Sequence, residues 1–68
     1  MNIDCLYTFV VVVETGSVNE AAKILYISQP NVSHRVSSLE KELSCQLFNR
    51  THPLTLTEHG KIVYEYAR

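Results

Sequence analysis

The sequence predicts one small, mainly α-helical domain of three helices, followed by a two-stranded hairpin and the start of a further helix. Two observations support this prediction. Apolar residues recur at helical spacing in successive segments, and residues that commonly cap helices stand at the segment boundaries. The chain then changes to short β-prone stretches around a proline, which is typical of a hairpin. With 68 residues, the chain has room for a single domain.

An apolar stripe at helical spacing defines the first expected helix, within IDCLYTFVVVVETGS; its members are Leu6, Phe9, Val10 and Val13. The run of four valines would also suit a strand, since β-branched residues favour strands. The length of the stripe favours a helix, and Gly16 is expected to form its C-terminal cap.

The second expected helix opens with a capping box, because Ser17 is followed three positions later by Glu20. In this motif the serine side chain accepts a bond from a free backbone N–H, and the glutamate reaches back to another. The helix is only about two turns long, so it must pack on its neighbours. Ala21 and Ala22 are small and allow another helix to approach closely.

The third expected helix begins at Ser28, a capping residue that follows the second helix after only two residues. Pro30 falls in the first turn, where the missing N–H would have no helical partner, so the proline starts the helix and does not break it. From Gln29 to Leu43, the helical period gathers the apolar residues on one side; these are Val32, Val36, Leu39 and Leu43.

The other side of this helix carries small and hydrogen-bonding residues near its N-terminus. Gln29 can present a donor and an acceptor together, which suits adenine. Ser33 and Ser37 are short, so the helix can approach DNA closely, and their hydroxyls can meet bases or phosphates. Pro30 offers a compact apolar surface for a thymine methyl group. The helix N-terminus adds free N–H groups and partial positive charge for phosphate.

Cationic and imidazole groups lie beside this polar face and in the expected hairpin turn. His34 can donate to guanine or to a phosphate, and Arg35 can pair with a phosphate or reach a guanine. Arg50 and His52 lie between the expected strands, and a narrow minor groove attracts both residue types. An arginine in such a turn is more often an ordinary surface residue.

The stretches 47–49 and 54–56 are expected to form the hairpin, with Leu54 and Leu56 on its buried face. Thr57 then caps a last helix. Two helices joined by a very short turn, the second with a polar N-terminal face, predict a helix-turn-helix at about 18–37. The hairpin at about 47–56 is its wing, and the second helix would enter the DNA major groove.

The overall charge favours a different function. The formal net charge is −1 and the sequence pI is about 6.2, whereas nucleic-acid-binding domains are usually basic. A winged helix that binds protein and not DNA is therefore the main alternative. Salt dependence distinguishes the two, because a DNA binder loses affinity steeply as salt rises.

Enzyme activity is the weakest interpretation, and we expect no cofactor and no metal. The sequence has no glycine-rich phosphate loop, no nucleophile with a positioned base and no histidine–cysteine group at metal spacing. Cys5 and Cys45 lie far apart and are expected to be thiols in a reducing cytoplasm. No apolar window approaches the length of a membrane span.

The run SVNEAAKILYISQPNVSHRVSSLEKELSCQLFNR…LTLTEHG resembles the N-terminal DNA-binding domain of LysR-type transcriptional regulators of bacteria. The resemblance covers essentially the whole chain. It rests on Gly16-Ser17, Ala21-Ala22, Ser28-Gln29-Pro30, Ser33, Leu39-Glu40, Leu47-Phe48 with Arg50, and Leu56-Thr57 with Gly60.

This resemblance implies a winged helix-turn-helix over residues 1–58, with a recognition helix that starts at Ser28. It also implies that Arg50 lies near the wing and that the residues at the DNA are Gln29, Pro30, Ser33 and His34. Residues 59–68 would begin a linker helix that pairs with its copy in a dimer. Family members continue into a larger effector-binding domain, so a small-molecule effector would act only through a domain absent from this chain. The expected location is the bacterial cytoplasm, at the nucleoid through DNA binding.

Two positions depart from the family pattern. The family usually has glycine where Ser44 stands, so the third helix is expected to end differently without a change of fold. The position of His34 is often arginine or lysine in relatives, so a neutral histidine here is expected to weaken DNA binding.

Overall fold

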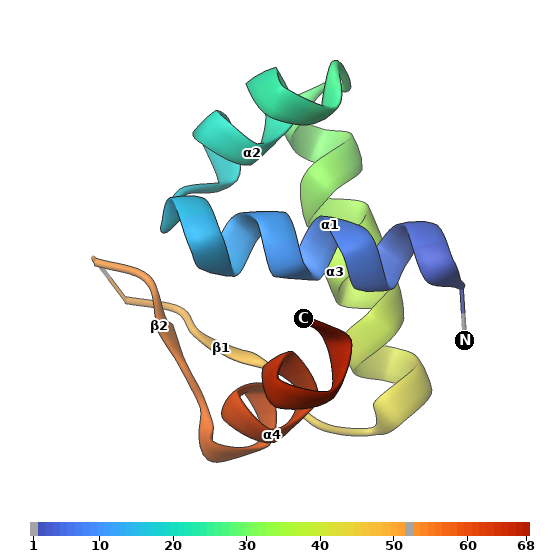
Figure 1. Cartoon of the computed structure of the whole chain (residues 1–68), viewed down its shortest axis with the longest axis vertical. Helices are drawn as coiled ribbons and strands as arrows, with labels where there is room; N and C mark the ends of the chain where they lie inside the picture. The colour runs from blue at the N-terminus through green and yellow to red at the C-terminus, as the bar shows by residue number, and fades with distance from the viewer. Residues whose placement is uncertain (1, 52) are drawn as a thin grey trace.

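The computed structural model of the chain is described for residues 2–51 and 53–68, and it has the predicted order of elements (Figure 1). The predicted fold class, mainly α-helical with a two-stranded wing, is confirmed. The elements are α1 (Ile3–Thr15), α2 (Val18–Leu25), α3 (Gln29–Leu43), β1 (Phe48–Asn49), β2 (Thr55–Leu56) and α4 (Glu58–Ala67).

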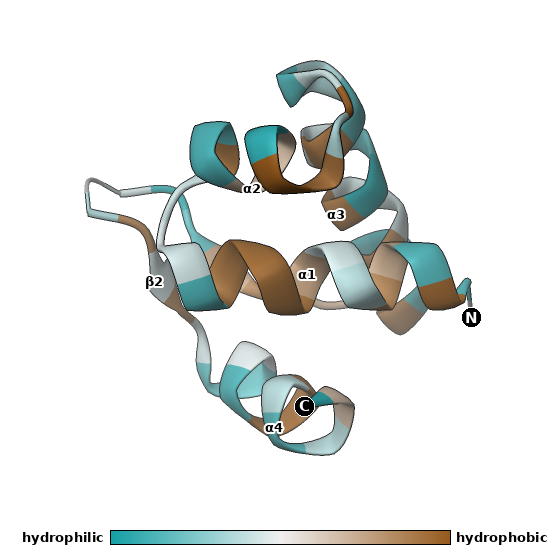
Figure 2. Cartoon of the chain, turned by 45° about the horizontal axis from the view of Figure 1, so that its top comes forward, coloured by the Kyte–Doolittle hydropathy of each residue, from teal (hydrophilic) through white to brown (hydrophobic). Residues whose placement is uncertain are grey.

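Helix α1 is the central element, because it contacts α2, α3 and α4. In Figure 1, α3 crosses behind α1, and in Figure 2, α2 and α4 lie on opposite sides of α1. The apolar side of α2 faces α1 in the same view. The rings of Phe9 and Phe48 meet in the core with centroids 5.4 Å apart. The buried apolar residues are Phe9, Val11, Val12, Ala21, Ala22, Val32, Val36, Leu39, Leu47 and Phe48.

The buried face of α1 differs from the predicted stripe. Phe9 is buried as expected, but Val11 and Val12 are buried as well. The other predicted members are only partly buried; they are Leu6, Val10 and Val13. Because α1 packs on neighbours on both sides, apolar residues are needed around much of its surface and a single stripe does not describe it.

The caps between α1 and α2 are partly as predicted. Gly16 ends α1 with φ at +71°, and the Ser17 hydroxyl accepts a bond from the Glu20 N–H at 3.2 Å. The second half of the predicted capping box is wrong. The Ser17 N–H donates to the Thr15 hydroxyl at 3.4 Å, while the Glu20 carboxylate pairs with Lys23 at 3.5 Å. Thr15 lies at the end of α1, two residues before Ser17, so its hydroxyl is close enough to accept this bond.

Helix α3 begins and ends at serines. The Ser28 hydroxyl accepts from the Asn31 N–H at 3.3 Å, and Pro30 lies in the first turn, as predicted. At the other end, Ser44 has φ at +56°, the left-handed conformation that glycine adopts at least cost. The helix therefore ends in the left-handed conformation that glycine favours, although a serine stands there.

The hairpin is antiparallel and short. Phe48 lies opposite Leu56, and Asn49 lies opposite Thr55. The strands are shorter than predicted, since residues 47 and 54 are outside them. Leu54 and Leu56 are half-buried and pack against the core, as predicted.

Thr57 joins the hairpin to α4. Its hydroxyl accepts from the Gly60 N–H at 3.0 Å and donates to the Gln46 carbonyl at 2.6 Å. Its backbone N–H donates to the Leu47 carbonyl at 3.0 Å. Gly60 is buried there, and a Cβ on it would collide with that same carbonyl oxygen and lie 2.9 Å from Leu56 Cδ2. Glycine is needed at this position for close approach.

Candidate nucleic-acid interface

The turn between α2 and α3 consists of Tyr26, Ile27 and the cap residue Ser28. Tyr26 is in the left-handed conformation, with φ at +57°, and its N–H bonds to the end of α2. The Ile27 N–H donates to the Ala22 carbonyl at 3.2 Å, and the Ile27 side chain packs against the core. These contacts hold the start of α3 close to α2 and leave its first turn at the surface.

Gln29 and Ser33 form a pair on this surface. The Gln29 amide nitrogen donates to the Ser33 hydroxyl at 3.2 Å, one turn further along α3. Gln29 is exposed and Ser33 is half-buried. The bond uses one amide hydrogen, so the amide oxygen, the second amide hydrogen and the serine O–H remain for a partner. The structure thus brings together two residues that the sequence predicts at DNA.

Four more predicted residues lie exposed along the same helix. Pro30 presents its ring in the first turn, and the Ser28 hydroxyl accepts from the Asn31 N–H but can still donate. His34 and Ser37 are exposed, and within residues 2–51 and 53–68 their side chains have no hydrogen-bond partner. These side chains therefore make a neutral, hydrogen-bonding face at the N-terminal half of α3.

Arg35 is turned away from this face. Its Nη1 donates to the hydroxyl of Thr8 on α1 at 3.2 Å, and Thr8 is fully buried. The side chain is half-buried between the two helices. The helical period places Arg35 on the flank of α3, but the sequence offers no sign that a threonine on α1 binds it.

Arg50 is also occupied within the protein. Its Nη2 donates to Oε1 of Glu40 at 2.7 Å, with 58% of the arginine side chain and 10% of the glutamate side chain exposed. The other predicted wing residue, His52, lies outside the described residues. Two of the cations expected at DNA are therefore bound to partners within the chain, and the described interface carries little free positive charge.

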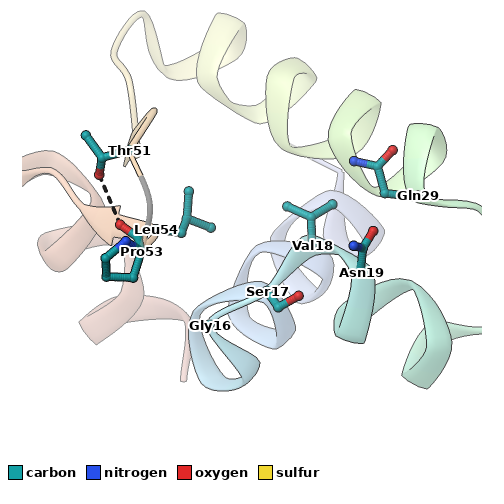
Figure 3. Close-up of a pocket in the computed structure, with 8 residues that line it drawn as sticks. All are labelled: Gly16, Ser17, Val18, Asn19, Gln29, Thr51, Pro53 and Leu54. Carbon is teal, nitrogen blue, oxygen red and sulfur yellow. Dashed lines mark hydrogen bonds between the residues drawn. The ribbon is translucent and has the colours of Figure 1, made fainter.

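A hollow of about 380 Å³ separates the start of α2 from the wing (Figure 3). Gln29 and Asn19 lie on one side of it, and Thr51, Pro53 and Leu54 on the other. The hollow is lined by Gly16, Ser17, Val18, Asn19, Gln29, Thr51, Pro53 and Leu54. The Thr51 hydroxyl donates to the Pro53 carbonyl at 3.0 Å, a bond within the segment that joins the two strands.

Sequence reasoning missed Asn19 and Thr51 at this hollow. Asn19 is an exposed amide in the first turn of α2, and the first helix of a helix-turn-helix crosses the DNA backbone. An exposed amide at that place in the predicted first helix could therefore have indicated a contact with the DNA backbone. Thr51 carries no comparable signal, because its place depends on how the hairpin folds back.

The described residues contain neither a candidate metal site nor a helix that could span a membrane. No group of three or more histidine, cysteine, aspartate or glutamate side chains in residues 2–51 and 53–68 could hold a metal ion. Within the same ranges, every helix is too short or too polar to cross a membrane.

A family model matches residues 3–61, and its description is "Bacterial regulatory helix-turn-helix protein, lysR family". The nitrogen assimilation regulatory protein nac of Klebsiella aerogenes is 46% identical over 69 residues, which cover all of this chain and 23% of that protein. The HTH-type transcriptional regulator YtlI of Bacillus subtilis is 43% identical over 96% of this chain and 21% of its own length. The chain thus spans less than a quarter of these relatives.

Solved structures agree with these matches. The DNA-binding domain of BenM, in a complex with catB site 1 DNA, is 41% identical with a TM-score of 0.95. The match covers 98% of this chain and 76% of that one. The DNA-binding domain of CbnR, also in a DNA complex, is 36% identical with a TM-score of 0.94, over all of this chain and 79% of that one.

Proposed function

The chain belongs to the lysR family of bacterial regulatory helix-turn-helix proteins, and from this premise we propose that it binds double-stranded DNA as the DNA-binding part of a transcriptional regulator. The main observation is the exposed, hydrogen-bonding N-terminal face of α3, which follows a three-residue turn. The fold matches two domains solved on DNA. The relatives are regulators, which confirms the prediction that the chain is not an enzyme.

In this proposal the first turns of α3 enter the major groove. The Gln29–Ser33 pair presents donors and an acceptor to base edges. Its internal bond already orders the two side chains, so less conformational entropy is lost on binding. Pro30 contacts a thymine methyl group, while His34 and Ser37 donate to bases or phosphates. Arg35 reaches a phosphate only if it leaves Thr8.

The hollow between α2 and the wing receives the sugar–phosphate backbone. The first turns of α2 and α3 leave some backbone N–H groups without a partner in the helix, and anions are favoured at such termini. Asn19 and Thr51 supply neutral polar groups on its two sides. The wing then lies near the adjacent minor groove. This arrangement relies on hydrogen bonds more than on charge, which is consistent with the formal net charge of −1.

We further propose the predicted division of the chain, in which residues 1–58 bind DNA and residues 59–68 begin a helix that pairs with its copy. Exposed apolar side chains mark that surface: Ile3 and Tyr7 on α1, and Ile62 and Tyr66 on α4. Ile62 and Tyr66 border a hollow of about 330 Å³ between α4 and the end of α3, and Ile3 and Tyr7 line a second hollow of about 550 Å³ between α1 and the end of α4. A symmetric dimer would bind two half-sites separated by about one helical turn or a multiple of it. Any effector would bind to a different domain.

The alternative is a winged helix that binds only protein. It is favoured by the net charge and by the internal bonds of Arg35 and Arg50, because nonspecific DNA affinity comes from neutralised phosphates. The two functions differ in their salt dependence. With few free cations, we expect a DNA binder whose affinity falls with salt, but with a slope near −2 in logarithmic terms, the value for about two phosphate contacts.

Selection from a random DNA library at low salt tests the proposal. The wild-type chain should enrich one half-site, and a Gln29→Ala/Ser33→Ala variant should lose that enrichment. Gln46→Ala, which removes an exposed side-chain amide beyond the C-terminal end of α3, is the matched control and should enrich the same half-site. Circular dichroism shows that each sample is folded, and sedimentation gives its oligomeric state. If a folded, dimeric wild-type sample enriches nothing, the protein-binding alternative replaces this one.

A further inference from the structure

We propose that Glu40 sets the position of the wing relative to the recognition helix, and that Arg50 affects DNA binding through this carboxylate and not by touching DNA. The inference rests on the proposed function, since it assigns roles within the same DNA-binding surface. It differs from the expectation that Arg50 enters the minor groove.

The Glu40 carboxylate bonds three positions of the segment that enters the wing. Oε2 accepts from the Leu47 N–H at 2.7 Å and from the Phe48 N–H at 3.4 Å. Oε1 accepts from Arg50 at 2.7 Å. Glu40 itself lies in the C-terminal half of α3 and is only 9% exposed. One side chain therefore links the recognition helix to the beginning and to the end of β1.

The hairpin depends on such links because its own ladder is minimal. β1 and β2 pair at only two positions, and an isolated two-stranded hairpin is at best marginally stable in water. Thr57 holds the base of the hairpin through Leu47 and Gln46. Glu40 adds the connection to α3, and Arg50 lies on the far side of β1 from that base. The tilt of the wing against α3 therefore depends on this ion pair.

Charge supports the same assignment. A buried carboxylate must be paired, and breaking a buried pair leaves an uncompensated charge. Arg50 supplies the pairing charge, with a short, charge-assisted bond. The only other residue in 47–56 that can carry positive charge is His52. The wing segment and Glu40 together thus bring almost no net charge to DNA.

Glu40→Gln separates the two roles because they predict opposite results. If Arg50 acts instead through its charge at a phosphate, the substitution removes the carboxylate that competes for it, so DNA binding tightens. If Glu40 positions the wing, binding to the selected half-site weakens by about tenfold, the loss of roughly one specific contact, and the slope is unchanged. Glu42→Gln makes the same change in net charge on the exposed side of α3 and should bind like wild type.

Arg50 is tested in the same assay. Arg50→Met should weaken binding, and the Glu40→Gln/Arg50→Met double variant should bind no more weakly than Glu40→Gln alone, because both changes break one linkage. Arg50→Lys should recover part of the loss by restoring the charge. A drop in the salt slope of about 1 in Arg50→Met, or additive losses in the double variant, would overturn the proposal.

Hydrogen exchange of the Leu47 amide gives a readout that needs no DNA. The amide should be protected in wild type and in Arg50→Met, and it should exchange faster in Glu40→Leu, which has no acceptor, at a temperature where circular dichroism shows all three folded. Unchanged protection in Glu40→Leu would overturn the positioning role. If the wild-type chain binds no DNA, the proposed function is wrong. The exchange result then decides separately whether Glu40 holds the wing.

Discussion

Arg35 on α3 donates to the hydroxyl of Thr8 on α1, with 3.2 Å between Nη1 and Oγ1. The Thr8 hydroxyl donates in turn to the Asp4 carbonyl at 2.7 Å. This chain of bonds crosses from the recognition helix to the helix that supports it. It stabilises the contact between the two helices and removes a cation from the surface that would face DNA.

Thr8→Val should therefore release Arg35. We expect the free energy of unfolding to fall by about 1 kcal/mol, the usual net worth of such a bond. DNA binding should tighten, and its salt slope should steepen by about 1, because the freed guanidinium can reach a phosphate. Urea denaturation followed by circular dichroism and DNA titrations at several salt concentrations measure the two effects.

The matched control is Thr15→Val, the same chemical change on the same helix. The Thr15 hydroxyl bonds to the Val11 carbonyl at 2.9 Å and makes no contact with Arg35. It should cost stability without changing the salt slope. A Thr8→Val protein with the wild-type slope would show that Arg35 does not reach DNA even when released.

His34→Arg should tighten DNA binding by about fivefold, since it places a cation on the exposed face of α3. The logarithmic salt slope should steepen by about 1 for the added phosphate contact. His59→Arg makes the same change on α4, away from that face, and should leave both values near wild type. Equal effects of the two substitutions would indicate a response to net charge alone.

Ser44→Gly should stabilise the protein. A non-glycine residue in the left-handed conformation costs about 1–2 kcal/mol, part of which glycine loses again to the entropy of the unfolded chain. The net gain should be about 0.5–1 kcal/mol, seen as a higher Tm. Ser38→Gly, inside α3, should lower stability by about 0.5 kcal/mol. A lower Tm for Ser44→Gly would contradict the strain inferred at this cap.

Gly60→Ala should destabilise the protein by about 2 kcal/mol or more, although alanine is the better helix former. The added methyl group would collide with the Leu47 carbonyl, which belongs to the backbone and cannot move alone. Denaturation curves of this variant and of the neighbouring His59→Ala measure the difference. Helix propensity alone predicts the opposite sign, so any stabilisation would rule out the close approach.

Stability should fall as the pH rises above about 10, partly because of Tyr64. Partial burial, followed by the hydrogen bond to Glu14, raises the pKa of its phenol above the ordinary value of 10.0. The folded protein then holds a proton that the unfolded chain releases, so this contribution is complete below pH 10 and is lost through the raised pKa. Tyr64→Phe should lose less stability between pH 9 and about 11. Tyr66→Phe, at a side chain that is 89% exposed, should behave like wild type.

Local chemistry was predictable from the sequence. The caps at Gly16, Ser17, Ser28 and Thr57 follow from residues within one turn of each helix end, and all four are in place. The buried face of α3 also follows from its period, because that helix buries a single side. For α1, which packs on both sides, the same method fails.

Contacts between distant residues were not predictable in this way. Arg35 and Thr8 are 27 positions apart, and Arg50 and Glu40 are 10 apart, with a turn between them. A periodic pattern assigns every charged residue to the surface, so the sequence did not predict that Glu40 is buried. Only the return of the chain after α3 places three donors around it. The sequence therefore predicted which α3 residues are exposed at the candidate site, but it did not predict that Arg35 and Arg50 are bound within the chain.

Thr57 gives the wing a mechanical role. Because its amide and hydroxyl hold the start of the hairpin while its side chain caps α4, the hairpin and α4 share a rigid joint. A tilt of the wing in a DNA groove would therefore change the orientation of α4 as well. In two copies joined through α4, that reorientation would change the angle between the two recognition helices, and with it the curvature of DNA that fits both.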